Sequence, residues 1–323
     1  MTEDHIFTLT RAERERTREV AAALAEVEPG LVDDRAWLDA CRDMSQRLPE
    51  RLRRRLRAFR HDPRLDGMLL VRNLPVASVL PPTPAVAGSV ERKATPAAGT
   101  TALVSMQIGE VIAYRDEKSG ALVQNVVPVP GRETQQSNAG SVPLELHVEN
   151  AFHPHRPDMV ALFCVRPDHD GGAGLRVASV RRAIRMLPDD IRKVLGEDRF
   201  RTEVPPSFGG GPEGRAPRHP VLSGDFDDPD VRVDFHATRL ADEEDEQAAE
   251  AMTVLRAALD TITRAVHLLP GDLAVVDNRV ALHGRTHFVP RYDGEDRWLH
   301  RTFIHLDHRR SRAMRQGNGQ VLS

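Results

Sequence analysis

The chain has 323 residues, of which 29% are charged, and its 45 Lys and Arg nearly balance its 48 Asp and Glu. This balance provides no strong positive field for nucleic acid or an anionic membrane, and the lack of any run of about 18 apolar residues excludes a transmembrane helix. The two cysteines are too few for a disulfide scaffold or a Cys-based zinc finger, and the polar, acidic N-terminus has no signal-peptide pattern, so we expect a cytoplasmic protein.

Residues 1–66 are predicted to form a helical N-terminal part packed on the core. Thr10 followed by Glu13 has the pattern of a capping box at a helix start. A second helix is predicted at residues 48–59 because apolar residues recur there on one helix face: Leu48, Leu52, Leu56 and Phe59. The arginines between them are interpreted as a solvated face, since no aromatic or Gly-rich segment accompanies them. We therefore expect no nucleic-acid partner.

The rest of the chain is dominated by short apolar runs separated by turns, after a first short strand at residues 68–73. Residues 74–100 are rich in Pro, Ala and Thr and are predicted to be an extended connection over the surface of one domain rather than a linker between two. The later runs are typical of strands in a sandwich or barrel, and they cover residues 122–129, 144–149, 159–165, 273–276 and 301–306. The predicted fold class is mainly β with helical additions.

Two segments interrupt this pattern of strands. Residues 203–230 contain Pro205-Pro206 and three consecutive glycines from Gly209, which indicates an ordered lid or a flexible loop, and we favour a lid over the site. Residues 241–268 are predicted to form one long helix with an acidic first turn and an apolar face.

A candidate metal site is formed by residues from two distant segments. In Leu144-Glu-Leu-His-Val-Glu149 apolar and polar residues alternate, so in a strand His147 and Glu149 would share one face. Residues 273–283 form a buried strand and a turn that end at His283. Two His and one carboxylate with open positions form the facial arrangement of non-haem Fe(II) oxygenases.

An isolated His-x-Glu occurs often by chance, and a surface strand with polar residues is its simplest interpretation. The context favours a metal site, because Arg297 follows His283 by fourteen residues and an arginine there can bind the distal carboxylate of 2-oxoglutarate in bidentate fashion. His153 and His155 are alternative ligands, but Pro154 between them breaks strand alternation. We expect both in a loop.

Three segments resemble the clavaminate synthase family, and within it the branch that β-hydroxylates free amino acids such as arginine and asparagine. They are His147-Val-Glu-Asn-Ala-Phe-His-Pro-His-Arg-Pro-Asp158, Val276-Asp-Asn-Arg-Val-Ala-Leu-His-Gly-Arg285 and Arg291-Tyr-Asp-Gly-Glu-Asp-Arg-Trp-Leu-His-Arg301. The resemblance covers residues 66–310 and includes the identity, order and spacing of the motifs. It implies a double-stranded β-helix (jelly-roll) core in a single catalytic domain, residues 1–323. It also implies Fe(II) as cofactor, 2-oxoglutarate and O2 as cosubstrates, and hydroxylation at C3 or C4 of a free amino acid.

The resemblance also implies roles for individual residues. His147, Glu149 and His283 match the iron ligands, and Arg297 matches the residue that holds 2-oxoglutarate. Arg301, four residues further on, falls on the same strand face as Arg297 by alternation and matches the arginine for the substrate α-carboxylate.

Five further residues match positions near the substrate. Ser137 matches a substrate-contacting serine and Asp234 an acidic residue that meets the substrate side chain, while Glu117 and Gln124 both fall near the place of the substrate amino group and the sequence does not decide between them. His236 stands where some arginine hydroxylases have a second Asp, which weakens arginine as the substrate. Many relatives also have a Thr near Leu175 that contacts 2-oxoglutarate, and leucine cannot form that hydrogen bond.

The substrate expected from these residues is arginine or another basic or ureido amino acid, because a buried Asp234 without a donor would be costly. Asparagine, glutamine, lysine and citrulline are alternatives, as is desaturation in place of hydroxylation. The alternative from another class is a catalytically silent jelly-roll binding protein. A small amino acid is the one partner we expect, and the sequence does not indicate the oligomeric state.

Overall fold

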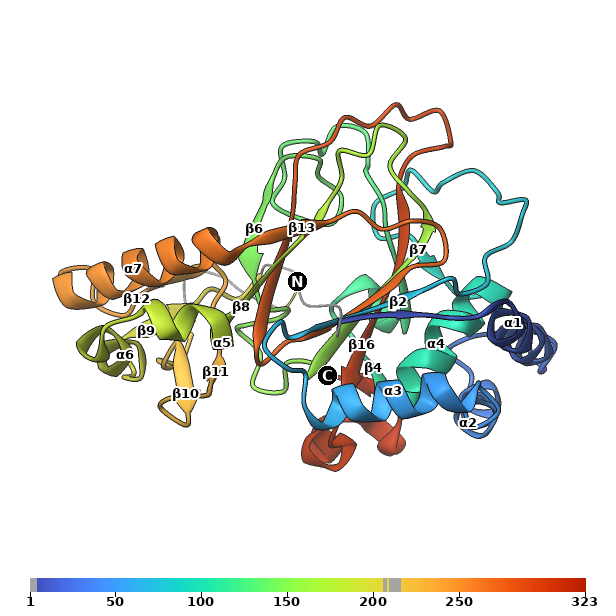
Figure 1. The fold of residues 1–323 in the computed structure, drawn as a ribbon, viewed down its shortest axis with the longest axis horizontal. Helices are drawn as coiled ribbons and strands as arrows, with labels where there is room; N and C mark the ends of the chain where they lie inside the picture. The colour runs from blue at the N-terminus through green and yellow to red at the C-terminus, as the bar shows by residue number, and fades with distance from the viewer. Residues whose placement is uncertain (1–4, 206–207, 209–215) are drawn as a thin grey trace.

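The computed structural model describes residues 5–205, 208 and 216–323. Two β-sheets enclose an inner core, and helices cover the outer side of each sheet (Figure 1). The larger sheet has nine strands: β1 (Ile6–Thr8), β2 (Met68–Arg72), β3 (Val90–Glu91), β4 (Glu110–Tyr114), β5 (Val123–Val126), β7 (Met159–Arg166), β14 (Leu273–Asp277), β16 (Trp298–His305) and β17 (Val321–Leu322). The smaller sheet has four strands in the order β13-β8-β15-β6: β6 (Leu144–His147), β8 (Leu175–Ser179), β13 (Arg264–Val266) and β15 (Ala281–Arg285).

The inner core lies between the two sheets. Leu162 and Leu299 from the larger sheet belong to the same buried cluster as Leu175 and Val177 from the smaller one. The order β2-β14-β7-β16-β4 places β16 next to β7 in the middle of the larger sheet, and all eight of its residues are buried. This sheet-rich core with helices agrees with the predicted fold class.

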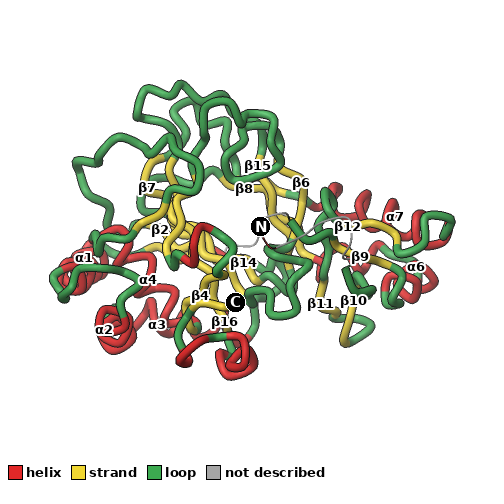
Figure 2. The backbone as a smooth tube through the Cα atoms, turned by 180° about the vertical axis from the view of Figure 1, so that it is seen from behind, coloured by secondary structure: helices red, strands yellow, loops and turns green. Residues whose placement is uncertain are grey.

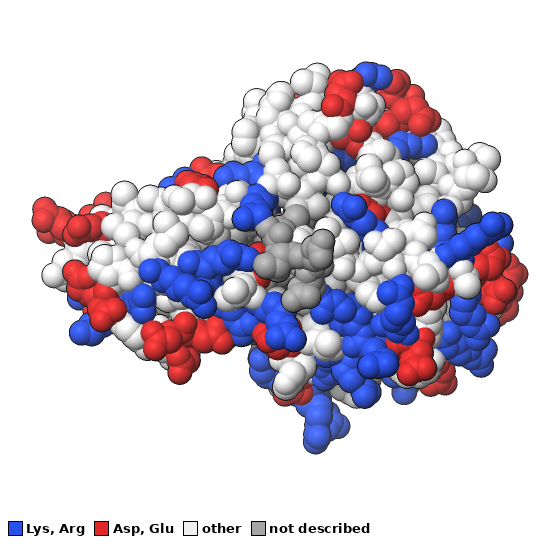
Figure 3. Space-filling model, in the orientation of Figure 1, with Lys and Arg blue, Asp and Glu red and all other residues white. Residues whose placement is uncertain are grey.

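The N-terminal helices cover the outer face of the larger sheet: α1 (Arg11–Ala25), α2 (Arg35–Ser45), α3 (Glu50–His61) and α4 (Pro96–Ile108). The predicted capping box is confirmed, since Thr10 and Glu13 form both of its hydrogen bonds at the start of α1. The predicted apolar face at residues 48–59 is confirmed in α3, where Leu52, Leu56 and Phe59 are buried. Figure 3 shows Lys and Arg side chains gathered over the surface around α3, with acidic groups among them.

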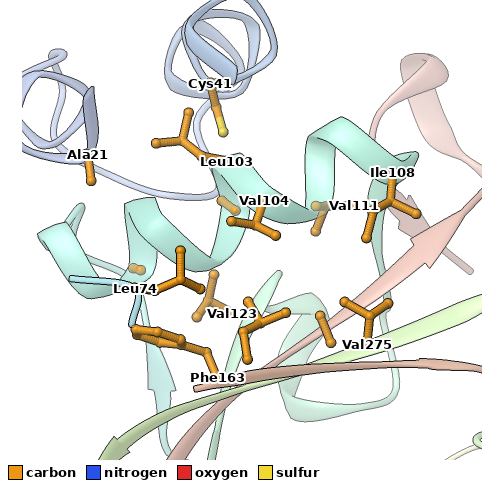
Figure 4. Close-up of a cluster of buried hydrophobic side chains, with 14 of the residues drawn as sticks. Ala21, Cys41, Leu74, Leu103, Val104, Ile108, Val111, Val123, Phe163 and Val275 are labelled. Carbon is orange, nitrogen blue, oxygen red and sulfur yellow. The ribbon is translucent and has the colours of Figure 1, made fainter. Parts of the chain in front are cut away.

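Helix α4 contradicts the prediction that residues 74–100 are only a surface connection. It begins at Pro96, with the Thr95 side chain as N-cap, and it lies between the other N-terminal helices and the sheet (Figure 4). Its small and apolar residues are buried on nearly every side, so its sequence has no amphipathic period by which to recognise it.

The second helical group lies on the other side of the smaller sheet (Figures 1 and 2). It consists of α5 (Val180–Ala183), α6 (Asp189–Leu195) and α7 (Glu246–Ile262), with the short pairs β9 (Phe200–Thr202) and β12 (Thr238–Leu240), and β10 (Leu222–Gly224) and β11 (Pro229–Val231). The helix predicted at residues 241–268 is therefore too long at both ends. Residues after Ile262 instead form β13, because pairing with β8 overrides the local helical pattern. Among the described residues, no helix combines the length and apolarity needed to cross a membrane.

Candidate active site

The structure brings the three predicted metal ligands together at one end of the smaller sheet. His147 in β6 and His283 in β15 are paired across the two strands, with ring centroids 4.4 Å apart. Nε2 of His283 lies 3.3 Å from Oε2 of Glu149. One possible ligand atom from each residue lies within 4.8 Å of the others, and no second group of three such ligands was found in the described part of the chain.

The position of Glu149 beside the two histidines does not result from alternation along a strand. Strand β6 ends at His147, so the prediction of a strand through residue 149 is wrong. The fully buried Asn278 holds the backbone of Glu149 instead: its Oδ1 accepts from the Glu149 N–H at 2.7 Å, and its Nδ2 donates to the Glu149 carbonyl at 3.0 Å. The sequence analysis missed Asn278, although it lies in the Asp-Asn-Arg turn that leads to His283.

The protonation states suit a divalent metal ion. Burial, together with the neighbouring His147, lowers the pKa of His283 and keeps its imidazole neutral. Burial alone would raise the pKa of Glu149, but Arg301 and His283 hold it below its usual range, so the carboxylate is ionised. Nδ1 of His147 lies 2.9 Å from the Glu145 carbonyl, which leaves Nε2 for the metal. Two imidazoles and one carboxylate fit Fe(II).

His153 and His155 lie outside this group of ligands. The backbone N–H of His155 donates to Nδ1 of His153 at 3.0 Å, and the His153 ring packs edge-on against Tyr114 with ring centroids 4.8 Å apart. Both residues lie in the loop after Glu149, as the sequence predicts.

Arg297 is a buried cation that lacks a protein partner among the described residues. It directly precedes β16 and is 6% exposed, and its guanidinium forms no hydrogen bond or ion pair within the described part of the chain. Burial lowers its pKa to about 10, so it remains charged at neutral pH. The charge of Asp168 favours the charged form of Arg297, but a buried guanidinium without a hydrogen-bonded partner is costly, so this position suits an anion from outside the chain. Leu175 is buried in the inner core and offers no side-chain hydrogen bond there.

Arg301 lies in β16 and faces the metal ligands. Its Nη1 donates to Oε1 of Glu149 at 2.5 Å, its Nη2 binds the Glu117 carboxylate, and its Nε donates to Oε1 of Gln124 at 3.1 Å. With its side-chain oxygen turned toward the guanidinium, Asn138 accepts from both Nη atoms at 3.1 Å. Arg301 is therefore a buried cation that is paired with carboxylate and amide oxygens beside the metal ligands.

A cavity of about 180 Å³ opens beside His147 and Glu149. The residues predicted to contact substrate that line it are Glu117, Ser137, Asp234, His236 and Arg301. Gln124 is absent from this lining and lies behind Arg301 on β5. The geometry therefore favours Glu117 over Gln124 as the residue nearest a bound ligand.

Asp234 lies beside His147, with which it forms an isolated β-bridge. Its Oδ1 accepts the backbone N–H groups of His236 at 2.8 Å and Ala237 at 3.2 Å, while its Oδ2 forms no hydrogen bond within the described residues. The His236 side chain is exposed at the cavity wall. Glu203 also lines the cavity, but its carboxylate pairs with Arg239 at 3.4 Å.

The sequence analysis missed two asparagines at this cavity. Asn138 faces Arg301 as described above, and Asn150 donates from Nδ2 to Oε2 of Glu117 at 3.3 Å. Each directly follows a residue that was singled out, Ser137 and Glu149, and that adjacency was the available signal. Part of the lid predicted at residues 203–230 lies outside the described residues; of the described part, Glu203 and Pro205 line the cavity.

The sequence of the chain is similar to that of one family of dioxygenases over most of its length. Residues 67–303 match the family model described as taurine catabolism dioxygenase TauD, TfdA family. The chain is 51% identical to the L-asparagine oxygenase of Streptomyces coelicolor over 98% of its own length and 94% of that protein. It is 36% identical to clavaminate synthase 2 of Streptomyces clavuligerus, over 91% of this chain and 90% of that one.

A solved structure shows the same backbone. The crystal structure of an asparagine oxygenase in complex with Fe(II), (2S,3S)-3-hydroxyasparagine and succinate superimposes with a TM-score of 0.94 at 49% identity, over 98% of this chain and 99% of that chain. The chain belongs to the TauD/TfdA family of dioxygenases, among its clavaminate synthase-like members.

Proposed function

We propose that this dioxygenase hydroxylates C3 of free L-asparagine, with Fe(II) as cofactor and 2-oxoglutarate and O2 as cosubstrates. The observation that carries the proposal is the small cavity beside His147 and Glu149, which is lined by Arg301 and Glu117 next to Glu149 and by Asp234 next to His147. These groups complement a carboxylate, an ammonium group and one short hydrogen-bonding side chain. The similar asparagine oxygenase, whose structure contains 3-hydroxyasparagine and succinate, supports the same substrate.

The scaffold for this reaction is inferred to be a double-stranded β-helix formed by the two sheets. The N-terminal helices share one buried cluster with the larger sheet, which supports a single catalytic domain over residues 1–323.

The metal and the cosubstrate would be held by separate groups. His147, Glu149 and His283 would bind Fe(II), and the unpaired Arg297 would bind the distal carboxylate of 2-oxoglutarate in bidentate fashion. When bound, the metal supplies the activation of O2, by which 2-oxoglutarate becomes succinate and CO2 and one C–H bond of the substrate becomes C–OH. Glu149 occupies a position that a halogenase needs for halide, which supports hydroxylation.

The amino acid would be oriented by its two charged groups and its side chain. Arg301 would bind the α-carboxylate, and Glu117, held by Asn150, would accept from the α-ammonium group. Oδ2 of Asp234 would accept an N–H of the side-chain amide. With its charged groups and its side chain held in this way, a four-carbon amino acid would present C3 beside His147 and Glu149, as a well-placed reactant requires.

The cavity favours an amide over a longer cation. A guanidinium group is best matched by two carboxylates, but His236 replaces one of them and Glu203 is paired with Arg239. A basic amino acid remains the second candidate, and the observation that favours it is Glu203 itself, a second carboxylate in the cavity wall.

The test is a competition among the twenty amino acids plus citrulline and ornithine, with Fe(II) and 2-oxoglutarate, and product masses as the readout. We expect L-asparagine to gain one oxygen atom in step with succinate, and Asp234→Asn to reduce kcat/KM for asparagine by about 10- to 100-fold, since a hydrogen bond to a charged acceptor is worth roughly 1.5–3 kcal/mol. Asp260→Asn is the matched control, because Asp260 is exposed and does not line the cavity. Preferred turnover of lysine, ornithine or arginine would select the second candidate.

A further inference from the structure

A chain of three buried polar side chains leads to Asp234 from the strands β9 and β12, which lie in the second helical group (Figure 1). Its members are His219, Thr202 in β9 and Thr238 in β12. Oγ1 of Thr202 lies 2.9 Å from Nε2 of His219 and 2.9 Å from Oγ1 of Thr238. The backbone N–H of Asp234 donates to Oγ1 of Thr238 at 2.9 Å. A continuous line of hydrogen bonds therefore joins His219 to the backbone of Asp234.

The position of each proton in this chain follows from the protonation of His219. Its Nδ1 lies 2.9 Å from the Pro220 carbonyl, and since a carbonyl only accepts, Nδ1 carries the proton. Burial lowers the pKa of His219 to about 4, so the ring is neutral at pH 7 and Nε2 is an acceptor. The Thr202 hydroxyl therefore donates to Nε2 of His219. The Thr238 hydroxyl in turn donates to Thr202 and accepts from the backbone of Asp234.

The opposite order of protons would leave one hydroxyl group without an acceptor. A proton on Nε2 of His219 would donate to Thr202, whose own proton would then point to Thr238. The Thr238 hydroxyl has no further acceptor among the described residues, and a buried hydroxyl without a partner is costly. The chain thus has one favourable direction, in which every polar hydrogen has an acceptor.

This chain holds the turn at residues 234–238, which forms part of the cavity wall. The backbone N–H groups of Ala237 and Thr238 donate to the Asp234 carbonyl at 3.0 and 2.6 Å. Oδ1 of Asp234 accepts from the backbone of His236 and Ala237, which leaves Oδ2 as the free oxygen of the carboxylate. The Thr238 hydroxyl thus completes a turn in which hydrogen bonds fix the orientation of this carboxylate.

The same turn is joined to a metal ligand on its other side. Asp234 forms a β-bridge with His147. The backbone N–H of Phe235 donates to the Leu146 carbonyl at 3.2 Å. The backbone of Asp234 is therefore held between the strand that carries His147 and the chain of hydroxyl groups, so a shift at Thr238 would turn the carboxylate relative to the metal ligands.

We propose that Thr238 and Thr202 are positioning residues: their hydroxyl groups form a chain of one direction that holds Asp234 in the orientation that selects a short side-chain amide. The proposal rests on the proposed function for the identity of the substrate. Neither hydroxyl group binds a metal ligand or Arg297. Loss of a hydroxyl should therefore affect the amino acid and not 2-oxoglutarate.

The first experiment compares the steady-state kinetics of Thr238→Val and Thr238→Ser with L-asparagine. Valine has nearly the shape of threonine without its hydroxyl, so we expect kcat/KM to fall about tenfold through KM, as for the loss of one buried hydrogen bond. The KM for 2-oxoglutarate should stay unchanged. Serine keeps the hydroxyl and should restore the KM of the wild type. Thr202→Val, one hydrogen bond further from Asp234, should raise the KM for asparagine in the same direction.

Thr17→Val is the matched control. Thr17 is also a buried threonine, and its hydroxyl donates to the Glu13 carbonyl at 2.8 Å, but it lies in α1 rather than beside Asp234. Both valine variants should lower the thermal stability, while only Thr238→Val should raise the KM for asparagine. An unchanged KM in Thr238→Val would overturn the proposal.

A double-mutant cycle separates positioning from a purely structural role. If Thr238 acts through Asp234, Thr238→Val should reduce kcat/KM for asparagine about tenfold in the wild type and hardly at all in Asp234→Asn. The same reduction in both backgrounds would overturn the proposal and leave the proposed function standing. A wild type that does not hydroxylate asparagine would overturn the proposed function, and the selection of an amide with it.

A measurement on the wild type tests the direction of the chain and serves if Thr238→Val does not fold. NMR of isotope-labelled histidine nitrogens, with diamagnetic Zn(II) in place of Fe(II), reports which ring nitrogen of His219 carries the proton at pH 7. The signal is assigned by its loss in His219→Gln. We expect the proton on Nδ1 and a hydrogen-bonded Nε2 that accepts. A proton on Nε2 would overturn the proposal.

Discussion

Arg297 and Arg301 lie four residues apart at the same strand, yet their surroundings differ in one decisive way. Arg301 has Glu117, Glu149, Gln124 and Asn138 as acceptors, whereas Arg297 has no such partner in the described part of the chain. Removing the sole cation from a buried ion pair costs roughly 3–5 kcal/mol. The two residues should therefore affect different ligands.

The corresponding prediction concerns the two affinities. Arg297→Ala should weaken the binding of 2-oxoglutarate by on the order of a hundredfold or more and leave the affinity for asparagine nearly unchanged. Arg301→Ala should instead weaken the binding of asparagine. Calorimetry on the anaerobic Fe(II) protein measures both, and equal damage to both ligands by each variant would refute the division.

A second residue-scale prediction concerns the metal. His283→Ala should abolish stoichiometric Fe(II) binding in anaerobic equilibrium dialysis, because it removes one of three ligands. His153→Ala is the matched control, since His153 is also partly buried but lies outside the ligand group, and it should bind iron normally. Iron binding that survives His283→Ala but is lost in His153→Ala would place the metal elsewhere.

At the scale of elements, the close approach of β6 and β15 sets the geometry of the metal site. Gly284 lies between His283 and Arg285, and a Cβ there would lie 2.5 Å from the Leu144 carbonyl oxygen of β6. That distance is shorter than any side chain tolerates, so a larger residue must push the strands apart.

Gly284→Ala should accordingly separate His147 from His283. We expect the affinity for Fe(II) to fall by at least about tenfold, since a disturbed ligand geometry lowers metal affinity by that much. Gly172→Ala is the control, because a Cβ at Gly172 would meet its nearest atom at an ordinary 3.4 Å. Dialysis with Fe(II) and thermal unfolding give the readouts. Normal iron affinity in Gly284→Ala would show that the strand spacing does not control the site.

The link between α1 and α3 gives an element-scale prediction with a pH dependence. Glu13 caps α1 through Thr10 and forms an ion pair with Arg51 of α3 at 2.7 Å. The hydrogen bond from Arg51 is the main cause that lowers the pKa of Glu13 from 4.5 to about 2. Folding thus favours the ionised form, so its contribution is complete above pH 4.5 and disappears as the pH falls toward 2.

Glu13→Gln keeps a residue suited to the capping box and removes the charge. We expect it to lower the free energy of unfolding by about 1 kcal/mol at pH 7, because Arg51 is half exposed and such pairs are worth little more. Urea unfolding at pH 7 and pH 3 should show a smaller difference between variant and wild type at the lower pH. A difference that grows at pH 3 would contradict this assignment.

The elements also show where sequence analysis succeeds. Helix α3 could be predicted because its buried leucines recur at helical spacing, and β7 and β14 because they are apolar runs between turns. Helix α4 could not, since burial on all sides removes the period that would reveal it. The end of α7 at Ile262 depends on pairing between β13 and β8, which a local pattern does not contain.

The same contrast between local sequence patterns and long-range contacts applies to the active site. His147, Glu149 and His283 could be identified from residue type, order and family resemblance. The manner in which Glu149 is held could not, because Asn278 acts from 129 residues away. The choice between Glu117 and Gln124 likewise depends on the three-dimensional structure. Both residues bind Arg301, but Glu117 lines the cavity and Gln124 does not.

At the scale of the whole molecule, the larger sheet lies between the N-terminal helices and the active site. Its outer face is covered by the N-terminal helices, and its inner face contributes Arg301 to the cavity and Leu299 to the inner core. The smaller sheet brings His147 and His283 against that inner face. The site therefore depends on contacts between segments from both ends of the chain.

The most direct test of the central claim is the stoichiometry of the reaction with L-asparagine. Purified protein with Fe(II), 2-oxoglutarate, O2 and L-asparagine should release one succinate for each asparagine that gains one oxygen atom at C3, measured together by mass spectrometry and NMR. Omission of Fe(II) should stop both products. Succinate formation without hydroxylated asparagine, or hydroxylation of a basic amino acid in preference to asparagine, would contradict the account.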